Sequence, residues 1–374
     1  MIEELEIKNF KAFASAKVRL GRYTLLSGLN SSGKSTVIQA LALLRQASGA
    51  DGLPLNGELV ELGTGRDALT EFYSSAGEDP EIGFRIRDQA GHELEWRFRY
   101  GAEDDFLPLT YTSPPRLDHG RELALERAPD FSVFRDGFQY LRADRINPAV
   151  TFPRSYEMSV RRGFLGTRGE YAIDYLYHHQ EDLIESSELR HSETSTQLLA
   201  QVESWMGEIC PGVRVKAAVI ERTDLVRLDF QFVHTKELPT SERRPTNVGF
   251  GLTYVLPIVI ACLTAKPGAL LLLENPEAHI HPQGQSAMAR LTCAAAAAGA
   301  QVVVETHSDH ILNGVRLAVK QGRLSAQDVV LQYFLRNGLK IDISTPVIGS
   351  DGMISQWPAG FFDEWERALD ELLS

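Results

Sequence analysis

The sequence predicts an α/β fold, because three apolar strands each end in polar residues that lead toward a helix. The first strand covers residues 23–26 and leads through a glycine-bearing loop into an apolar helix at 37–44. The second strand, 270–273, ends in an acidic residue, and the third covers 301–305. Buried strands that alternate with helices are typical of parallel pairing, with helices on the faces of the sheet.

Alternating apolar and polar residues predict an antiparallel β lobe as well. Residues 2–7 alternate, and residues 18–20 offer a hairpin partner. Residues 82–88 and 93–100 have the same period, and the short polar segment between them predicts a second hairpin. Further strand pairs are predicted at 213–233 and at 328–335 with 339–344.

Further helices are predicted at 282–298, where alanine dominates and Gly299 follows, and at 309–320. The segment 168–208 has helical composition, with candidate core residues Leu176, Leu183, Leu198, Val202 and Trp205. The last predicted helix, 361–373, is amphipathic, with Phe362, Trp365, Leu369 and Leu372 on one face. It is expected to pack on the rest of the fold, with binding of a partner as the alternative. The polar segments 101–130 and 236–247 are predicted to be surface loops.

Composition limits the classes of protein to which the chain can belong. It has 374 residues, and 38 Lys+Arg against 50 Asp+Glu give a formal net charge of −12. A protein that coats nucleic acid unaided needs a dense basic face, so the charge gives DNA binding no support. The cysteines, Cys210, Cys262 and Cys293, form no Cys-x-x-Cys pair, which favours a reducing cytosol over a disulfide framework.

The protein is expected to be cytoplasmic and to have no membrane segment. Its N-terminus is acidic and alternating, without the basic and apolar regions of a signal peptide. The longest apolar stretch, 252–265, is interrupted by Pro257 and is shorter than the roughly 20 residues that a spanning helix needs.

Residues 28–35 match the phosphate-loop pattern G-x-x-x-x-G-K-[ST] without departure, and they join a strand to a helix as that pattern requires. Such a loop turns successive backbone N–H groups toward the phosphates of a nucleotide. Lys34 is predicted to reach the β- and γ-phosphates, and Ser35 to give its hydroxyl to Mg²⁺. The candidate nucleotide-binding residues of the loop are Asn30, Ser31, Ser32, Gly33, Lys34, Ser35 and Thr36.

Two later strand ends carry candidate groups for chemistry on the phosphates. Glu274 ends the strand at 270–273, where a carboxylate is placed to bind Mg²⁺. His307 follows the strand at 301–305 and is a candidate to hydrogen-bond the γ-phosphate or its attacking water. The alternatives are a solvent-exposed glutamate and a structural histidine, and the phosphate loop earlier in the chain favours the functional roles.

Together, in this order, the motifs resemble the ATP-binding-cassette (ABC) head of the RecF and SMC proteins. They are more closely similar to bacterial ATPases of the OLD (overcoming lysogenization defect) kind. The similar phrases are residues 1–13, the Walker A loop 28–36, the Walker B run 274–282, the switch segment 306–308 and the tail 357–362. The tail resembles an uncharacterised C-terminal domain found on a subgroup of these ATPases.

The resemblance implies an α/β ABC-type P-loop NTPase head with a mixed sheet, an antiparallel β lobe and a helical insertion. It places lobe I at 1–145, the insertion at 146–210 and lobe II at 211–374.

The resemblance also implies a homodimer. In such heads the signature segment of one subunit packs on the γ-phosphate held by the second, so that two heads sandwich two ATP molecules. Residues 247–251 resemble that segment, where Gly249 and Gly251 would let the backbone approach phosphate. The alternative is a tight turn before a core helix.

One departure from the family pattern bears on hydrolysis. Such heads usually place a water-polarising glutamate directly after the metal-binding acid, and this chain has Asn275 there. An amide orients water but does not accept its proton, so either Glu277 takes that role or turnover is slow. The sequence also shows no acidic cluster of the OLD nuclease type and no long coiled coil, so nuclease activity and SMC-type tethering are not implied.

Two smaller groups have alternative roles. Arg142 and Arg145 flank Asp144 and are predicted to form ion pairs with it, with contact to phosphate or DNA as the alternative. His279 and His281 fall within the Walker B run and are expected at the nucleotide interface or in a structural role rather than in a zinc site.

These observations predict an Mg²⁺-dependent ATP hydrolase that closes as a homodimer. It would be the ATPase component of a bacterial DNA-transaction or phage-defence system with a separately encoded effector. The second hypothesis is a nucleotide-gated scaffold with little turnover, which Asn275 modestly favours. A nucleoside or small-molecule kinase is disfavoured, because the segments 247–251 and 277–282 have no role there.

Overall fold

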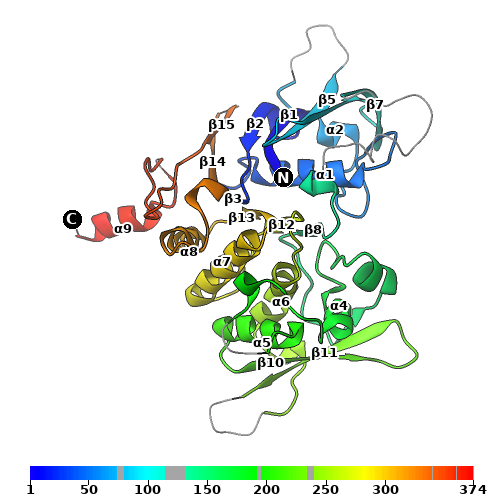
Figure 1. The fold of residues 1–374 in the computed structure, drawn as a ribbon. Helices are drawn as coiled ribbons and strands as arrows, with labels where there is room; N and C mark the ends of the chain where they lie inside the picture. The colour runs from blue at the N-terminus through cyan, green and yellow to red at the C-terminus, as the bar shows by residue number, and fades with distance from the viewer. Residues whose placement is uncertain are drawn as a thin grey trace. The chain divides into compact units, whose positions relative to one another are not determined.

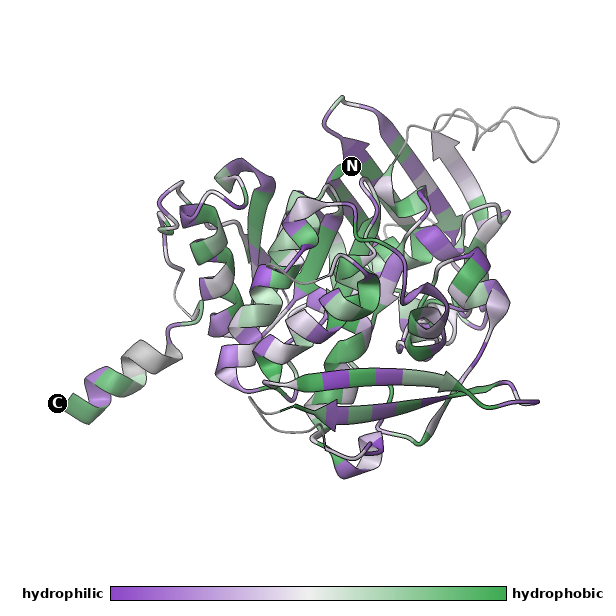
Figure 2. Ribbon diagram, turned by 60° about the horizontal axis from the view of Figure 1, so that its bottom comes forward, coloured by the Kyte–Doolittle hydropathy of each residue, from purple (hydrophilic) through white to green (hydrophobic). Residues whose placement is uncertain are grey.

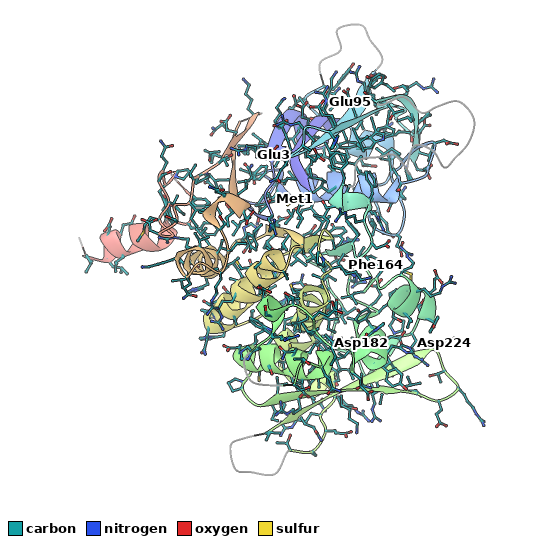
Figure 3. The ribbon with its side chains drawn as sticks, in the orientation of Figure 1. Met1, Glu3, Glu95, Phe164, Asp182 and Asp224 are labelled. Carbon is teal, nitrogen blue, oxygen red and sulfur yellow. The ribbon has the colours of Figure 1, made fainter. Side chains whose placement is uncertain are left out.

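The computed structural model describes residues 1–73, 80–113, 131–191, 195–233, 240–338, 340–358 and 360–373. Contacts divide the chain into two compact units (Figure 1). Unit 1 comprises Met1–Arg135, Gln327–Val347 and Ile354–Ser374, and unit 2 comprises Asp136–Ala326 and Ile348–Met353. The predicted lobe boundaries at 145 and 211 concern the ATPase architecture and stay a prediction. Figure 3 draws the side chains and labels Met1, Glu3 and Glu95 in unit 1 and Phe164, Asp182 and Asp224 in unit 2.

Unit 1 contains the predicted antiparallel lobe as a six-stranded sheet in the order β2-β1-β5-β6-β7-β4. Both predicted hairpins are confirmed, since β1 pairs antiparallel with β2, and β5 with β6. The strands are β1 (Ile2–Phe10), β2 (Phe13–Arg19), β4 (Gly52–Pro54), β5 (Glu81–Asp88), β6 (Glu93–Arg99) and β7 (Phe106–Ser113).

The surface loop predicted at 101–130 is wrong over residues 106–113, which form strand β7. The strand pairs with β6 on one side and β4 on the other. Thr110, Tyr111 and Thr112 are β-branched or aromatic, and such side chains fit a pleated surface better than their polarity suggests. Residues 114–130 lie outside the described residues.

A second ladder of unit 1 carries the phosphate loop. β3 (Tyr23–Gly28) pairs in parallel with β14 (Val329–Asn337), and β14 pairs antiparallel with β15 (Lys340–Ser344). Five of the six β3 residues are buried, as expected for a strand covered on both faces. The strand leads into α1 (Lys34–Gln46), whose apolar residues are buried, so the predicted strand–loop–helix is confirmed.

The C-terminal tail is fixed to this ladder by aromatic residues. Phe361 is fully buried, with its ring centroid 5.3 Å from that of Tyr333 in β14 and 5.4 Å from that of Trp357. The helix α9 (Glu364–Leu373) follows. The expectation that its apolar face packs is wrong for Leu369 and Leu372, which are 37% and 83% exposed, because the tail is anchored by Phe361 before the helix begins.

Unit 2 holds the other parallel strands. β12 (Leu270–Glu274) pairs in parallel with β13 (Gln301–Glu305) and with β8 (Gln139–Leu141). The helices α6 (Phe250–Leu263), α7 (Pro282–Ala297) and α8 (Asp309–Lys320) belong to the same unit. The predicted strands and helices of this region are confirmed. Among the described residues, no helix is both long and apolar enough to cross a membrane.

A separate three-stranded sheet of unit 2 has the order β10-β11-β9. It contains the strand pair predicted at 213–233 as β10 (Val213–Val219) and β11 (Leu225–Phe232), with β9 (Thr151–Pro153) at the edge. Apolar and polar residues alternate along β10 and β11, which gives the sheet one buried and one exposed face (Figure 2).

The segment predicted as helical, 168–208, contains α4 (Ala172–His179) and α5 (Leu198–Ile209). Residues 183 and 197 form a β-bridge between the helices, so the helical prediction is wrong there. Four of the predicted core residues are buried, namely Leu176, Leu198, Val202 and Trp205. Leu183 is 65% exposed, because it lies in the irregular connection and not on a helix face.

Candidate nucleotide site

The phosphate loop is closed by its own lysine. Lys34 is 3% exposed, and its Nζ donates to the carbonyl oxygens of Gly28 at 3.0 Å and Leu29 at 2.9 Å. Ser31 has a left-handed backbone with φ 60° and is exposed, as is Asn30. The ammonium group is therefore held by carbonyl oxygens of its own loop.

Two glycines of the loop are required by what packs against them. Gly28 has φ +140°, and a Cβ there would lie 2.3 Å from the carbonyl oxygen of Phe334 in β14. Gly33 has φ +97°, and a Cβ there would lie 2.6 Å from the ring of Phe13. A side chain at either position would strain the backbone and displace a neighbouring element.

The loop also holds a buried polar group suited to an anion. The Oγ of Ser32 is buried and has no hydrogen-bond partner within the described part of the chain. An unmade hydrogen bond at a buried hydroxyl costs about 1–3 kcal/mol, and a phosphate oxygen would accept that bond. Thr36 is buried and Ser35 partly buried at the start of α1, where the hydroxyl of Ser35 fits the role of a magnesium ligand.

In unit 2, the carboxylate of Glu274 is held at the end of β12 by two donors. Its Oε1 accepts from the hydroxyl of Tyr140 at 2.8 Å, and its Oε2 accepts from the backbone N–H of Ala143 at 3.0 Å. The side chain is partly exposed, and each oxygen retains lone pairs for a cation. This fits the predicted role of a metal ligand, since hard cations such as Mg²⁺ take carboxylate oxygens.

Glu277 has the properties of a general base. It is 8% exposed, and its Oε1 accepts from Thr306 Oγ1 at 2.7 Å and from the backbone N–H of His307 at 3.0 Å. Its other oxygen, Oε2, is buried without a hydrogen-bond partner among the described residues. Burial raises the pKa of Glu277 above its ordinary value, which makes the carboxylate a better proton acceptor.

Asn275 lies beside these acids with a strained backbone. Its φ is +44°, and its backbone N–H donates to the carbonyl of Glu305 at 2.8 Å. Its Oδ1 is also buried and finds no partner within the described ranges. The amide oxygen is thus available to orient water, the one part of the glutamate's role that asparagine retains.

His307 contributes its backbone to the site. Its N–H holds Glu277, and the next residue, Ser308, caps α8 by accepting from Ile311 N at 3.2 Å. The residue itself is exposed. The predicted site residues Glu274, Asn275, Glu277 and His307 therefore come together in unit 2, and the predicted loop residues 30–36 come together in unit 1.

Arg145 corrects one sequence prediction. Arg142 does pair with Asp144, with 2.9 Å between Nε and Oδ1. Arg145 is instead 1% exposed, and its guanidinium donates to the carbonyl oxygens of Glu274 at 2.6 Å and Asn275 at 2.7 Å. Arg142 lies two residues before Asp144 and Arg145 one residue after it, so nothing in the local sequence distinguishes the buried arginine from the paired one.

The predicted signature segment forms the start of α6, with Gly249 at its N-cap. A Cβ at Gly251 would lie 2.5 Å from the carbonyl oxygen of His279, so this glycine is needed for packing. Gly249 is exposed, and a Cβ there would meet none of the described atoms within 4 Å. No contact within the described structure therefore requires a glycine at position 249, and the exposed backbone there is open to close approach by another molecule.

A pocket of about 440 Å³ opens beside this segment. It is lined by Ile209, Cys210, Phe232, Arg243, residues 247–249, 251–252 and 279–281. The ring of His279 packs on Phe250 and Tyr254, with centroids 4.7 and 4.9 Å away, and His281 Nδ1 accepts from Gln283 N. In the described part of the chain, no three His, Cys, Asp or Glu side chains gather as a metal-binding group.

Comparison with known proteins identifies a family for most of the chain. A family model described as an AAA domain, putative AbiEii toxin, type IV TA system, matches residues 24–313. A second model, a protein family of unknown function designated DUF3696, matches residues 324–372, which confirms the predicted C-terminal domain. No curated protein compared with the chain matches it.

Solved SMC heads share the fold. An SMC head bound to the C-terminal winged-helix domain of ScpA has 14% identity and a TM-score of 0.58, over 92% of this chain and 97% of that one. An SMC head with an extended coiled coil, bound to the C-terminal domain of ScpA derived from Pyrococcus furiosus, has 14% identity and a TM-score of 0.51, over 100% of this chain and 99% of that one. The predicted fold class, that of an ABC-type P-loop NTPase head, is confirmed by the fold shared with these SMC heads. The chain belongs to the family described as an AAA domain, putative AbiEii toxin, type IV TA system.

Proposed function

We propose that the protein binds ATP with Mg²⁺ and hydrolyses it, and that nucleotide binding closes a homodimer. The observation that carries the proposal is Glu277, a buried carboxylate with one oxygen bonded to Thr306 and His307 and the other without a partner among the described residues. A buried carboxylate oxygen without a hydrogen bond destabilises the fold unless a partner binds it. The attacking water molecule of hydrolysis is a suitable partner.

Each site residue has a separate role in this reaction. Lys34 and the loop N–H groups bind the phosphates, and Ser35 with Glu274 would hold Mg²⁺, which neutralises charge on the phosphate oxygens. Asn275 Oδ1 orients the attacking water, and Glu277 Oε2 takes its proton. His307, exposed beside Glu277, hydrogen-bonds the γ-phosphate. Gly249 and Gly251 would face the γ-phosphate of the second subunit.

The lobes at 1–145 and 211–374, with the insertion at 146–210, are part of this proposal. We further propose a role in defence or DNA transactions in the cytoplasm, with a separately encoded effector. The family description, a putative toxin of a type IV toxin–antitoxin system, supports it, as does the ScpA partner of the SMC heads. The net charge of −12 gives direct DNA binding no support.

Steady-state ATP turnover with Mg²⁺ tests the activity, with the Lys34→Ala variant as background. Turnover of the wild type well above that variant is expected, together with a rate per subunit that rises with protein concentration as dimers form. Wild-type turnover equal to that of Lys34→Ala would contradict hydrolysis.

A second candidate is a nucleotide-gated scaffold that binds ATP and turns it over slowly. The observation in its favour is Asn275, which cannot accept a proton where related heads carry a glutamate. ATP-dependent dimerisation without turnover, measured by analytical ultracentrifugation, would favour the scaffold over the hydrolase.

A further inference from the structure

Arg145 connects α6, which begins in the predicted signature segment, to the acid end of β12, meaning Glu274 and the residues that follow it up to Glu277. Its guanidinium makes four hydrogen bonds, all to backbone carbonyl oxygens. The acceptors are Tyr254 at 3.1 Å, Arg142 at 2.8 Å, Glu274 at 2.6 Å and Asn275 at 2.7 Å. The planar, five-donor geometry of arginine allows this arrangement, which the compact ammonium group of a lysine does not reproduce.

Tyr254 completes the connection. The guanidinium carbon of Arg145 lies 4.3 Å from the centroid of the Tyr254 ring. The Tyr254 hydroxyl donates to the carbonyl of Ala143, whose own N–H holds Glu274 Oε2 at 3.0 Å. The Glu274 carboxylate and the Glu274 and Asn275 carbonyls are thus all tied to one tyrosine–arginine pair.

The other side of Tyr254 leads to the surface. Its ring lies 5.4 Å from that of Phe250, the first residue of α6, and 4.9 Å from that of His279. Phe250 is 39% exposed, and His279 lines the pocket beside the signature segment. A molecule that bound against Phe250 and His279 would therefore shift Tyr254, and through Tyr254 the groups that position Glu274.

We propose that Arg145 is a positioning residue. Together with Tyr254, it couples contact at the surface around Phe250 and His279 to the alignment of Glu274 and Asn275. The proposal rests on the proposed function, since it assigns the docking to the second head and the aligned groups to ATP hydrolysis. Arg145 acts through Glu274 and Asn275 and not by contact with the nucleotide. Burial lowers the pKa of Arg145 to about 10, so the guanidinium stays protonated at neutral pH and keeps all its donors.

Arg145→Lys and Tyr254→Phe test the coupling. Arg168→Lys is the matched control for the arginine, because the exposed Arg168 donates to the carbonyl of Asp144 in the same loop. Tyr175→Phe is the control for the tyrosine, a partly buried residue of α4 in the same unit. Turnover, ATP affinity, thermal midpoint and Mn²⁺ affinity with a non-hydrolysable ATP analogue are measured for each variant.

We expect Arg145→Lys to lower kcat at least tenfold and weaken Mn²⁺ binding several-fold, while its ATP affinity stays within threefold of the wild type. Tyr254→Phe keeps the ring and the four guanidinium bonds of Arg145 but loses the hydroxyl's bond to the Ala143 carbonyl, and it is expected to lower kcat three- to tenfold while ATP affinity stays within threefold of the wild type. The control variants are expected to match the wild type.

Unchanged kcat and Mn²⁺ affinity in both variants would overturn the inference. So would a parallel loss of ATP affinity and thermal midpoint in Tyr254→Phe, which would show a merely structural role. If the wild type itself fails to exceed Lys34→Ala in turnover, the proposed function fails instead, and the Mn²⁺ measurement decides on Arg145.

Discussion

The phosphate loop and the acid end of β12 are built in opposite ways. The loop is one continuous segment, and its charged group, Lys34, is satisfied by carbonyls of the same loop. The acid end combines four segments, around residues 140–145, 254, 274–277 and 306–307. It keeps two buried oxygens, on Asn275 and Glu277, with no partner in the described ranges. The loop proposed for binding is thus formed mainly by one segment, whereas the groups proposed for chemistry depend on distant packing.

The strongest test of the acid end is Glu277→Gln. A general base typically contributes about 10²–10⁴-fold to rate, so kcat should fall by that factor while ATP affinity is retained. Single-turnover and binding measurements check both. Glu221→Gln, at an exposed position of the same unit, is the control. Undiminished turnover would assign the base to another residue.

For the loop, Lys34→Ala should weaken ATP affinity by about 100-fold, because charge-assisted hydrogen bonds contribute roughly 1.5–3 kcal/mol each. Isothermal titration calorimetry with ATP measures the change. The exposed Lys17 of β2, replaced by alanine, should bind as the wild type does. Equal affinity of the Lys34 and Lys17 variants would show that the loop binds no triphosphate.

Gly28→Ala tests how far the loop is truly local. The added Cβ would meet the Phe334 carbonyl of β14, so the free energy of unfolding should fall by about 2–5 kcal/mol. Gly49→Ala is the control, since Gly49 also has positive φ but no described atom lies within 4 Å of its Cβ; about 1 kcal/mol is expected there. Equal losses in denaturant titrations would mean that β14 does not constrain the loop.

The smallest effect concerns pH and stability at the acid end. The pKa of Glu277 is raised by burial in the folded state, so its protonated form favours folding. Its contribution is complete below the unfolded pKa and is lost as pH rises through the folded pKa, by about 1.4 kcal/mol for each tenfold difference in proton affinity. Thermal midpoints between pH 4 and 8 should fall for the wild type relative to Glu277→Gln. Parallel curves would contradict the raised pKa.

The sequence by itself determined those elements that a single continuous segment specifies. The strand at 23–26, the loop at 28–36 and the helix after it follow one another directly, so motif and hydrophobic pattern specify them together. Local apolar runs also specify the strands that end at Glu274 and Glu305. In the structure these two strands pair in parallel, with Glu274 opposite Glu305.

Only the tertiary structure decided which polar groups are buried and what they touch. Arg145 and Arg142 look alike in sequence, yet one lies inside the unit and the other pairs with Asp144. Leu183 and Leu369 have apolar side chains in helical patterns, yet both are exposed. Burial depends on elements that arrive from far along the chain, as Tyr254 does at Arg145 and Thr306 at Glu277, and a local pattern carries no information about them.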